Sequence, residues 1–92
     1  MSCAKFIVSG KVQRVYYRKH ITNAMRENGF VGYVKNLNNG DVEVVVKNEP
    51  GMNIADILKI LNEGSPKSEV EAITMGECSD EIVFSKIFEV RY

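Results

Sequence analysis

The sequence predicts an α+β fold in which two helices cover one face of an antiparallel sheet of four to five strands. Three observations support this. Two segments have apolar residues at helical spacing, the other apolar runs are short and strand-like, and an Asn-Gly turn joins two of them. The 92 residues are expected to form one domain, 1–92, because a chain of this length buries roughly 60–65% of its unfolded surface, enough for a single core.

The first part of the chain predicts a strand followed by a helix. Residues 4–9 form a short apolar run typical of a largely buried strand, which Gly10 is expected to end. From Tyr17 to Glu27, apolar residues recur at i, i+4, i+7 and i+8, which is one face of a helix. Asn28-Gly29 follows, and a glycine after the last turn commonly ends a helix.

The middle of the chain is expected to form a β-hairpin. Residues 30–37 and 41–48 are strand-like, and the second run alternates, with three valines on one face. Asn38-Asn39-Gly40 lies between them. Asn-Gly between two strand patterns is the strongest short signal for a hairpin, so these two strands should pair directly.

The last part of the chain predicts a second helix and further strands. Asn53 is expected to cap a helix that begins at Ile54, and Gly64-Ser65-Pro66 should end it. Residues 69–75 and 82–92 then have strand patterns. The resulting order, βαββαβ with an additional strand near the end, is that of a ferredoxin-like, split βαβ sandwich.

The composition argues against several functional classes. Twelve basic and twelve acidic residues cancel, whereas nucleic-acid-binding proteins usually carry a basic excess. No secretory or membrane-spanning segment is visible, so we expect a cytoplasmic protein with no membrane partner. Cys3 and Cys78 are expected to be reduced thiols rather than a disulfide or a zinc site, and the single histidine leaves no multi-histidine metal site.

The segment from Gly10 to Arg18 is the first candidate site. It leaves a strand and enters a helix, so its backbone N–H groups are free to form a concave anion-binding nest at a helix N-terminus. The guanidinium of Arg18 offers a planar set of donors suited to a phosphate or a carboxylate. An ordinary connection with a solvated arginine is the alternative that these residues leave open.

Asn36 is the second candidate, at the end of a predicted strand and just before the hairpin turn. A side-chain amide accepts a hydrogen bond while donating another, which suits a group that positions a water molecule. The alternative is a turn-initiating asparagine.

Together these segments closely resemble the acylphosphatase family. The resemblance rests on Gly-x-Val-Gln-x-Val-x-Tyr-Arg at residues 10–18, Gly-Tyr-Val-x-Asn at 32–36, the Asn-Gly turn, and residues 64–68. It extends from about Lys5 to Tyr92. It implies hydrolysis of acyl phosphates to a carboxylate and inorganic phosphate, with no metal or cofactor.

The resemblance also implies roles for individual residues. Arg18 and Asn36 would be catalytic, with Arg18 binding the phosphoryl group and Asn36 orienting the attacking water. The backbone of the loop would hold the phosphate. The loop comprises Gln13, Arg14, Val15, Tyr16, Tyr17 and Arg18. The expected partners are a small-molecule acyl phosphate and the phosphate product, with no nucleic acid, and we expect a monomer. The Tyr17 side chain is expected in the core and His20 on the surface.

One departure from the family pattern bears on activity. The family usually reads Val-Gln-Gly-Val, whereas this chain has arginine at position 14. Where the backbone must be left-handed, arginine costs roughly 1–2 kcal/mol, and activity would fall or be lost. In a permissive backbone, Arg14 would add a second positive charge beside the phosphate.

Two other functions therefore remain open. The first is a non-catalytic phosphate- or anion-binding protein of the same fold. The second is an RNA-binding module, which stacks bases on aromatic residues of an exposed sheet face. Valines dominate residues 42–46 instead, and no basic–glycine–aromatic run is present.

Overall fold

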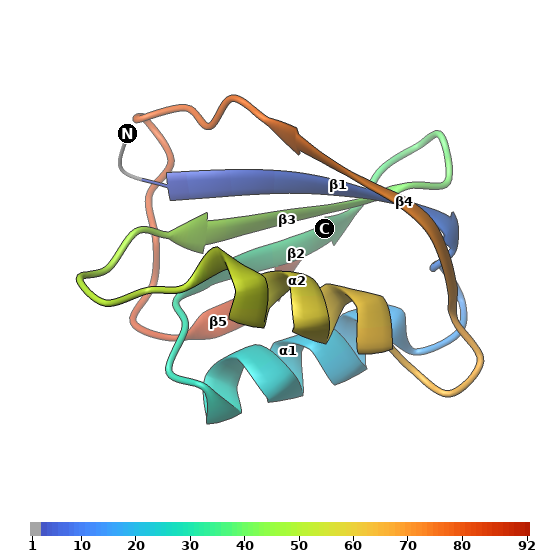
Figure 1. Cartoon of the computed structure of the whole chain (residues 1–92). Helices are drawn as coiled ribbons and strands as arrows, with labels where there is room; N and C mark the ends of the chain where they lie inside the picture. The colour runs from blue at the N-terminus through green and yellow to red at the C-terminus, as the bar shows by residue number, and fades with distance from the viewer. Residues whose placement is uncertain (1–2) are drawn as a thin grey trace.

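The computed structural model describes residues 3–92, which contain five strands and two helices in the predicted order (Figure 1). This confirms the ferredoxin-like α+β fold. The elements are β1 (Cys3–Lys11), α1 (Tyr17–Glu27), β2 (Gly32–Asn36), β3 (Val42–Lys47), α2 (Ile54–Glu63), β4 (Glu69–Gly76) and β5 (Phe88–Arg91).

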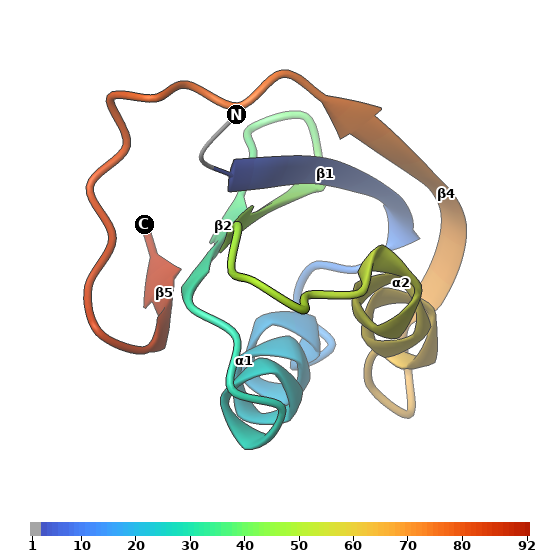
Figure 2. The same cartoon turned by 60° about the vertical axis from the view of Figure 1, so that its left-hand side comes forward.

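The sheet has the strand order β4-β1-β3-β2-β5, and its first four strands pair antiparallel. The fifth pairs parallel with β2, so the sheet is mixed rather than antiparallel as expected. The reason is the connection of residues 77–87, which runs from β4 at one edge to β5 at the other (Figure 2). As a consequence, β1, β2 and β5 all run in one direction and end at the same end of the sheet.

Both helices lie on one face of the sheet, as Figure 2 shows, and the main core fills the space between them and the strands. Each helix follows its sequence signals. Asn53 caps α2 by accepting a hydrogen bond from the Ala55 amide (2.9 Å), and Gly29 follows α1 with φ 76°. The fully buried core side chains include Phe6, Val8, Ile21, Met25, Val34, Val44, Ile57, Leu61 and Phe88.

Gly10 continues β1 instead of ending it, contrary to the prediction. It lies at a register shift where Ser9 pairs with Ala72 and Gly10 pairs with Val70, which leaves one extra residue on β4. A side chain at Gly10 would collide with the backbone of Glu69. The glycine therefore marks a close approach of two strands at a β-bulge, and not a strand end.

The final strand is shorter than predicted, because residues 82–87 do not pair with the sheet. They belong to the connection between the two sheet edges, and Ile82 and Phe84 pack on a second, smaller cluster with Tyr33 and Val45. This cluster lies on the face opposite the helices. Residues 77–87 thus partly cover the outer face of the sheet.

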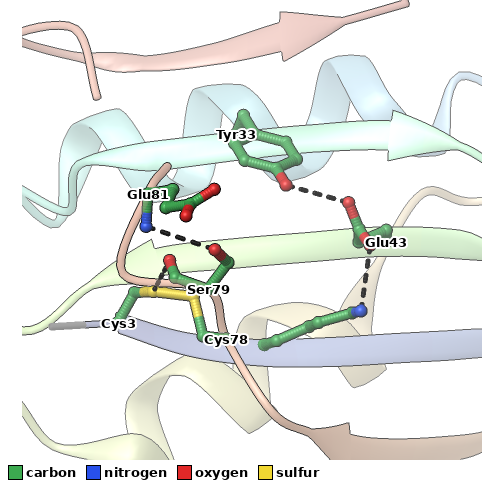
Figure 3. Close-up of a disulfide and its surroundings, with 7 residues drawn as sticks. Cys3, Tyr33, Glu43, Cys78, Ser79 and Glu81 are labelled. Atoms are coloured by element: carbon green, nitrogen blue, oxygen red, sulfur yellow. Dashed lines mark hydrogen bonds and ion pairs between the residues drawn. A yellow bond between two sulfur atoms is a disulfide. The ribbon is translucent and has the colours of Figure 1, made fainter. Parts of the chain in front are cut away.

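Cys3 and Cys78 form a disulfide that fastens this connection to β1, so the expectation of two reduced thiols was wrong (Figure 3). The cysteines are 75 positions apart, and sequence separation alone gave no reason to pair them. The crossing of the connection over the sheet brings their Cα atoms to 5.9 Å, a normal separation for a disulfide.

A polar network lies next to the disulfide on the outer face (Figure 3). The Tyr33 hydroxyl donates to the Glu43 carboxylate (2.9 Å), which also pairs with the Lys5 ammonium group (3.4 Å). Burial, followed by the Glu43 carboxylate, raises the pKa of Tyr33 to about 12. None of the helices within residues 3–92 has the length and apolar character needed to cross a membrane.

Candidate active site

The two candidate segments meet at one end of the sheet. The loop of residues 12–16 follows the end of β1, and Asn36 is the last residue of β2. Between these strands lies β3, where Val42 pairs with Val8 on one side and with Asn36 on the other. The sheet register therefore places Asn36 level with Val8, three residues before β1 ends at Lys11.

The loop backbone has two residues in the left-handed region. Arg14 has φ 61° and Tyr16 has φ 60°, whereas Gln13 and Val15 do not have positive φ. Alternating signs of φ turn successive N–H groups toward one concave side, which is the geometry of an anion-binding nest. The family's glycine position is thus left-handed in this chain, so Arg14 occupies a strained conformation.

The N–H groups of this loop are available to a ligand. Within the described residues 3–92, no backbone amide from Gln13 to Lys19 donates a hydrogen bond. Tyr16 precedes the first residue of α1, and its side chain makes no capping hydrogen bond. These seven N–H groups therefore lie at the positive end of the helix dipole, an arrangement that favours a bound anion.

Two side chains brace the loop from below. The Gln13 amide nitrogen donates to the carbonyl oxygens of Leu37 and Asp41, both at 2.8 Å. The buried Ser65 hydroxyl donates to the carbonyl of Val15 (2.6 Å). Gln13 thus links the loop to the turn that follows Asn36, and Ser65 links it to the end of α2. The amide nitrogen of Gln13 is used in these two hydrogen bonds, so it is not directed at a ligand.

Tyr17 lies in the core beneath the loop, as expected. Its ring is buried and its hydroxyl donates to the carbonyl of Leu61 (2.7 Å). Burial raises the pKa of the Tyr17 hydroxyl well above its ordinary value. Its contribution to an anion site is therefore limited to its backbone amide. His20 is exposed on α1, also as expected.

Arg18 lies at the start of α1 beside a groove of about 780 Å³. Its guanidinium carbon is 5.0 Å from the centroid of the Tyr92 ring, a cation–π contact between the helix and the residue after β5. The groove runs between α1 and β5. Its lining includes Arg14, Tyr16, Arg18, Lys19, Arg26, Glu89 and Tyr92.

Asn36 differs from the other polar groups of the site, because its side-chain oxygen is buried without a hydrogen-bond partner in residues 3–92. Asn36 is two residues after Val34 in β2, so its side chain is on the core and helix side of the sheet. It is not among the residues that line the groove. A buried acceptor without a partner is unfavourable, so a hydrogen bond to this oxygen from a donor such as water would be stabilising.

Sequence patterns did not indicate the roles of Ser65 and Tyr92. Ser65 lies 50 positions from Val15, and Tyr92 reaches Arg18 only because β5 is parallel to β1. The Gly64-Ser65-Pro66 motif was a usable signal for Ser65. A side chain at Gly64 would overlap the Tyr17 ring, which shows how closely this turn packs under the loop.

Comparison with known proteins gives one consistent result. Residues 4–90 match the family model described as Acylphosphatase. An acylphosphatase of Vibrio vulnificus is 41% identical over 75 residues, which is 82% of each chain. The crystal structure of acylphosphatase from Bacillus subtilis covers both chains completely, with a TM-score of 0.79 and 26% identity. The structure of an acylphosphatase from Coxiella burnetii has a TM-score of 0.76 and 34% identity, covering 98% of this chain and 92% of that chain.

Proposed function

Because the chain belongs to the acylphosphatase family, we propose that it hydrolyses the carboxyl–phosphate bond of small acyl phosphates, with the phosphoryl group held by the loop and Arg18 and the water oriented by Asn36. The unpartnered, buried Asn36 oxygen is the observation that carries this proposal. Asn36 ends β2, and the next residue, Leu37, accepts a hydrogen bond of 2.8 Å from the Gln13 side chain of the loop.

The loop supports the phosphate-binding part of the proposal. Its alternating backbone and its free amides from Gln13 to Lys19 match the needs of a group with several anionic oxygens. Arg18 adds a guanidinium at the positive end of α1, and the Tyr92 ring beneath it restricts its orientation. The side chains of Gln13 and Tyr17 are held by hydrogen bonds to Leu37, Asp41 and Leu61, and Val15 packs in the core, so these residues would contribute their backbone amides.

The chemistry requires few further groups. A water molecule attacks phosphorus, the bond between phosphorus and the acyl oxygen breaks, and the carboxylate leaves as a stable anion. The proton lost by the water passes to a phosphate oxygen. Phosphoryl transfer depends mainly on positioning and on stabilising charge, which backbone amides, one arginine and one asparagine provide.

The first test is hydrolysis of benzoyl phosphate by the purified chain, with a chelator present. Asn36→Ala is expected to lower kcat by at least ~100-fold while the protein stays folded, because it removes a preorganised polar group. Asn38→Ala is the matched control, since Asn38 is exposed two positions later in the turn. Near-normal turnover in Asn36→Ala would remove Asn36 from the mechanism.

A second arm tests the phosphate site. Arg18→Ala is expected to weaken inhibition by inorganic phosphate roughly tenfold or more, the effect of losing a charged hydrogen bond of about 1.5–3 kcal/mol. His20→Ala, on the exposed side of the same helix, should leave inhibition unchanged. Equal inhibition of the native chain and Arg18→Ala would contradict the role of Arg18.

A non-catalytic anion-binding protein remains the second candidate, because Arg14 occupies a strained left-handed position in the loop. Phosphate binding without turnover, together with activity in Arg14→Gly, would support it. The RNA-binding alternative has less support. The aromatic residue on the outer face of the strands, Tyr33, is buried under residues 77–87 and is not available for stacking.

A further inference from the structure

The groove beside the loop carries more positive charge than one phosphoryl group needs. Four cationic side chains line it, those of Arg14, Arg18, Lys19 and Arg26, against one acidic side chain, that of Glu89. Basic and acidic residues balance over the whole chain, so this excess is concentrated at one place. A cleft lined mainly by one sign of charge favours a ligand of the opposite sign.

Several of these groups already have partners. Glu89 pairs with Arg91 (3.5 Å), and the Arg26 side chain donates to the carbonyl of Phe88 (2.7 Å). Arg18 is stacked on Tyr92 and is assigned to the phosphoryl group. For Arg14 and Lys19, residues 3–92 provide no side-chain hydrogen bond and no ion pair. Two cations of the groove are therefore available to a second anionic group.

Arg14 is the better placed of the two. It belongs to the loop itself, and its side chain lines the groove while those of Gln13 and Val15 turn under the loop. The groove, at about 780 Å³, is much larger than a phosphoryl group and has the size of a small-molecule site. The remaining space beside Arg14 is where the acyl part of a bound substrate would lie.

We propose that Arg14 makes this chain selective for acyl phosphates whose acyl group carries a second negative charge, such as a carboxylate. This inference rests on the proposed function and adds the substrate class to it. The acyl carboxylate would accept charge-assisted hydrogen bonds from the Arg14 guanidinium, with Lys19 adding to the local positive potential. Arg14 is exposed, and it lines the groove.

The test compares 4-carboxybenzoyl phosphate with 4-methylbenzoyl phosphate, which differ at the ring position farthest from the reacting bond. Both are assayed with the native chain, Arg14→Gln, Arg14→Lys and Lys11→Gln. The kcat/KM for 4-carboxybenzoyl phosphate divided by that for 4-methylbenzoyl phosphate should fall about fivefold in Arg14→Gln, which is the effect of one partly exposed ionic contact. Arg14→Lys should keep most of the ratio. Lys11→Gln, which removes an exposed charge outside the groove, should not change it.

The decrease in this kcat/KM ratio should come mainly from a higher KM for 4-carboxybenzoyl phosphate. The decrease should become smaller as salt is added, because salt screens the ionic contact. An equal ratio in the native chain and Arg14→Gln, with both substrates turned over, overturns the inference and leaves the proposed function intact. No turnover of either substrate by the native chain or by Arg14→Gly contradicts the proposed function instead. In that case, the Kd values of 4-carboxybenzyl and 4-methylbenzyl phosphonate decide the role of Arg14. A shift of their ratio in Arg14→Gln supports it, and equal ratios overturn it.

Discussion

The side-chain amide of Gln13 donates a hydrogen bond of 2.8 Å to the carbonyl of Leu37, the residue directly after Asn36. The same nitrogen is 2.8 Å from the carbonyl of Asp41, across the hairpin turn. One side chain therefore joins the loop to the strand end that carries Asn36. In the proposed mechanism, this contact sets the distance between the bound phosphoryl group and the attacking water.

Gln13→Ala is expected to lower the free energy of unfolding by about 1–2 kcal/mol, because two partly buried carbonyls lose a donor. It should also lower kcat by roughly tenfold through misplacement of Asn36. Urea unfolding and benzoyl phosphate hydrolysis measure the two effects. Asn39→Ala is the control, since it removes exposed hydrogen bonds from the same turn without touching the loop. If both variants lose turnover equally, Gln13 has no special positioning role.

Arg14 should reverse the usual ranking of glycine and alanine. At φ 61°, Arg14→Gly is expected to be more stable than Arg14→Ala by about 1 kcal/mol, because glycine has no Cβ to clash in the left-handed region. At Asn23, exposed within α1, the glycine variant should be the less stable by about 1 kcal/mol. Thermal or urea unfolding of the four variants checks both signs. The same order at both positions would show that the loop is not left-handed at Arg14.

The disulfide should contribute strongly to stability, since it closes a loop of 75 residues in the unfolded chain. Reduction is expected to lower the free energy of unfolding by about 4.5 kcal/mol on the chain-entropy model. Urea unfolding with and without reductant measures this difference. The Cys3→Ser, Cys78→Ser double variant should match the reduced protein and be insensitive to reductant. Superimposable curves for the native chain in both conditions would mean that the bond does not form.

Tyr33 should make the fold sensitive to alkaline pH. Its pKa is raised from 10.0 to about 12 by burial and by Glu43, so the folded state favours the protonated phenol. Stability should therefore be complete below pH 10 and decline as the pH rises toward 12. The decline should be smaller in Tyr33→Phe, whereas Tyr17 contributes equally to both proteins. Identical slopes of unfolding free energy against pH in the two proteins would contradict this assignment.

Local sequence patterns were sufficient to predict the elements and the two segments of the candidate site. Helix spacing, the Asn53 cap and the Asn-Gly turn act over fewer than ten residues, so they can be read without the tertiary structure. Arg18 and Asn36 were candidates for the same reason, because each lies at the boundary of an element that the sequence predicts. The split βαβ order put the ends of β1 and β2 at one end of the sheet, which brought the two segments together.

The tertiary structure decided the features that depend on contacts between distant segments. The disulfide between Cys3 and Cys78 and the stacking of Arg18 on Tyr92 both result from the path of residues 77–87, which carries the chain from one sheet edge to the other and makes β5 parallel. No local pattern encodes that path, because the exposed connection has no regular period. The backbone of Arg14 was also undetermined, since its left-handed conformation is held by the packing beneath the loop and arginine itself does not favour it.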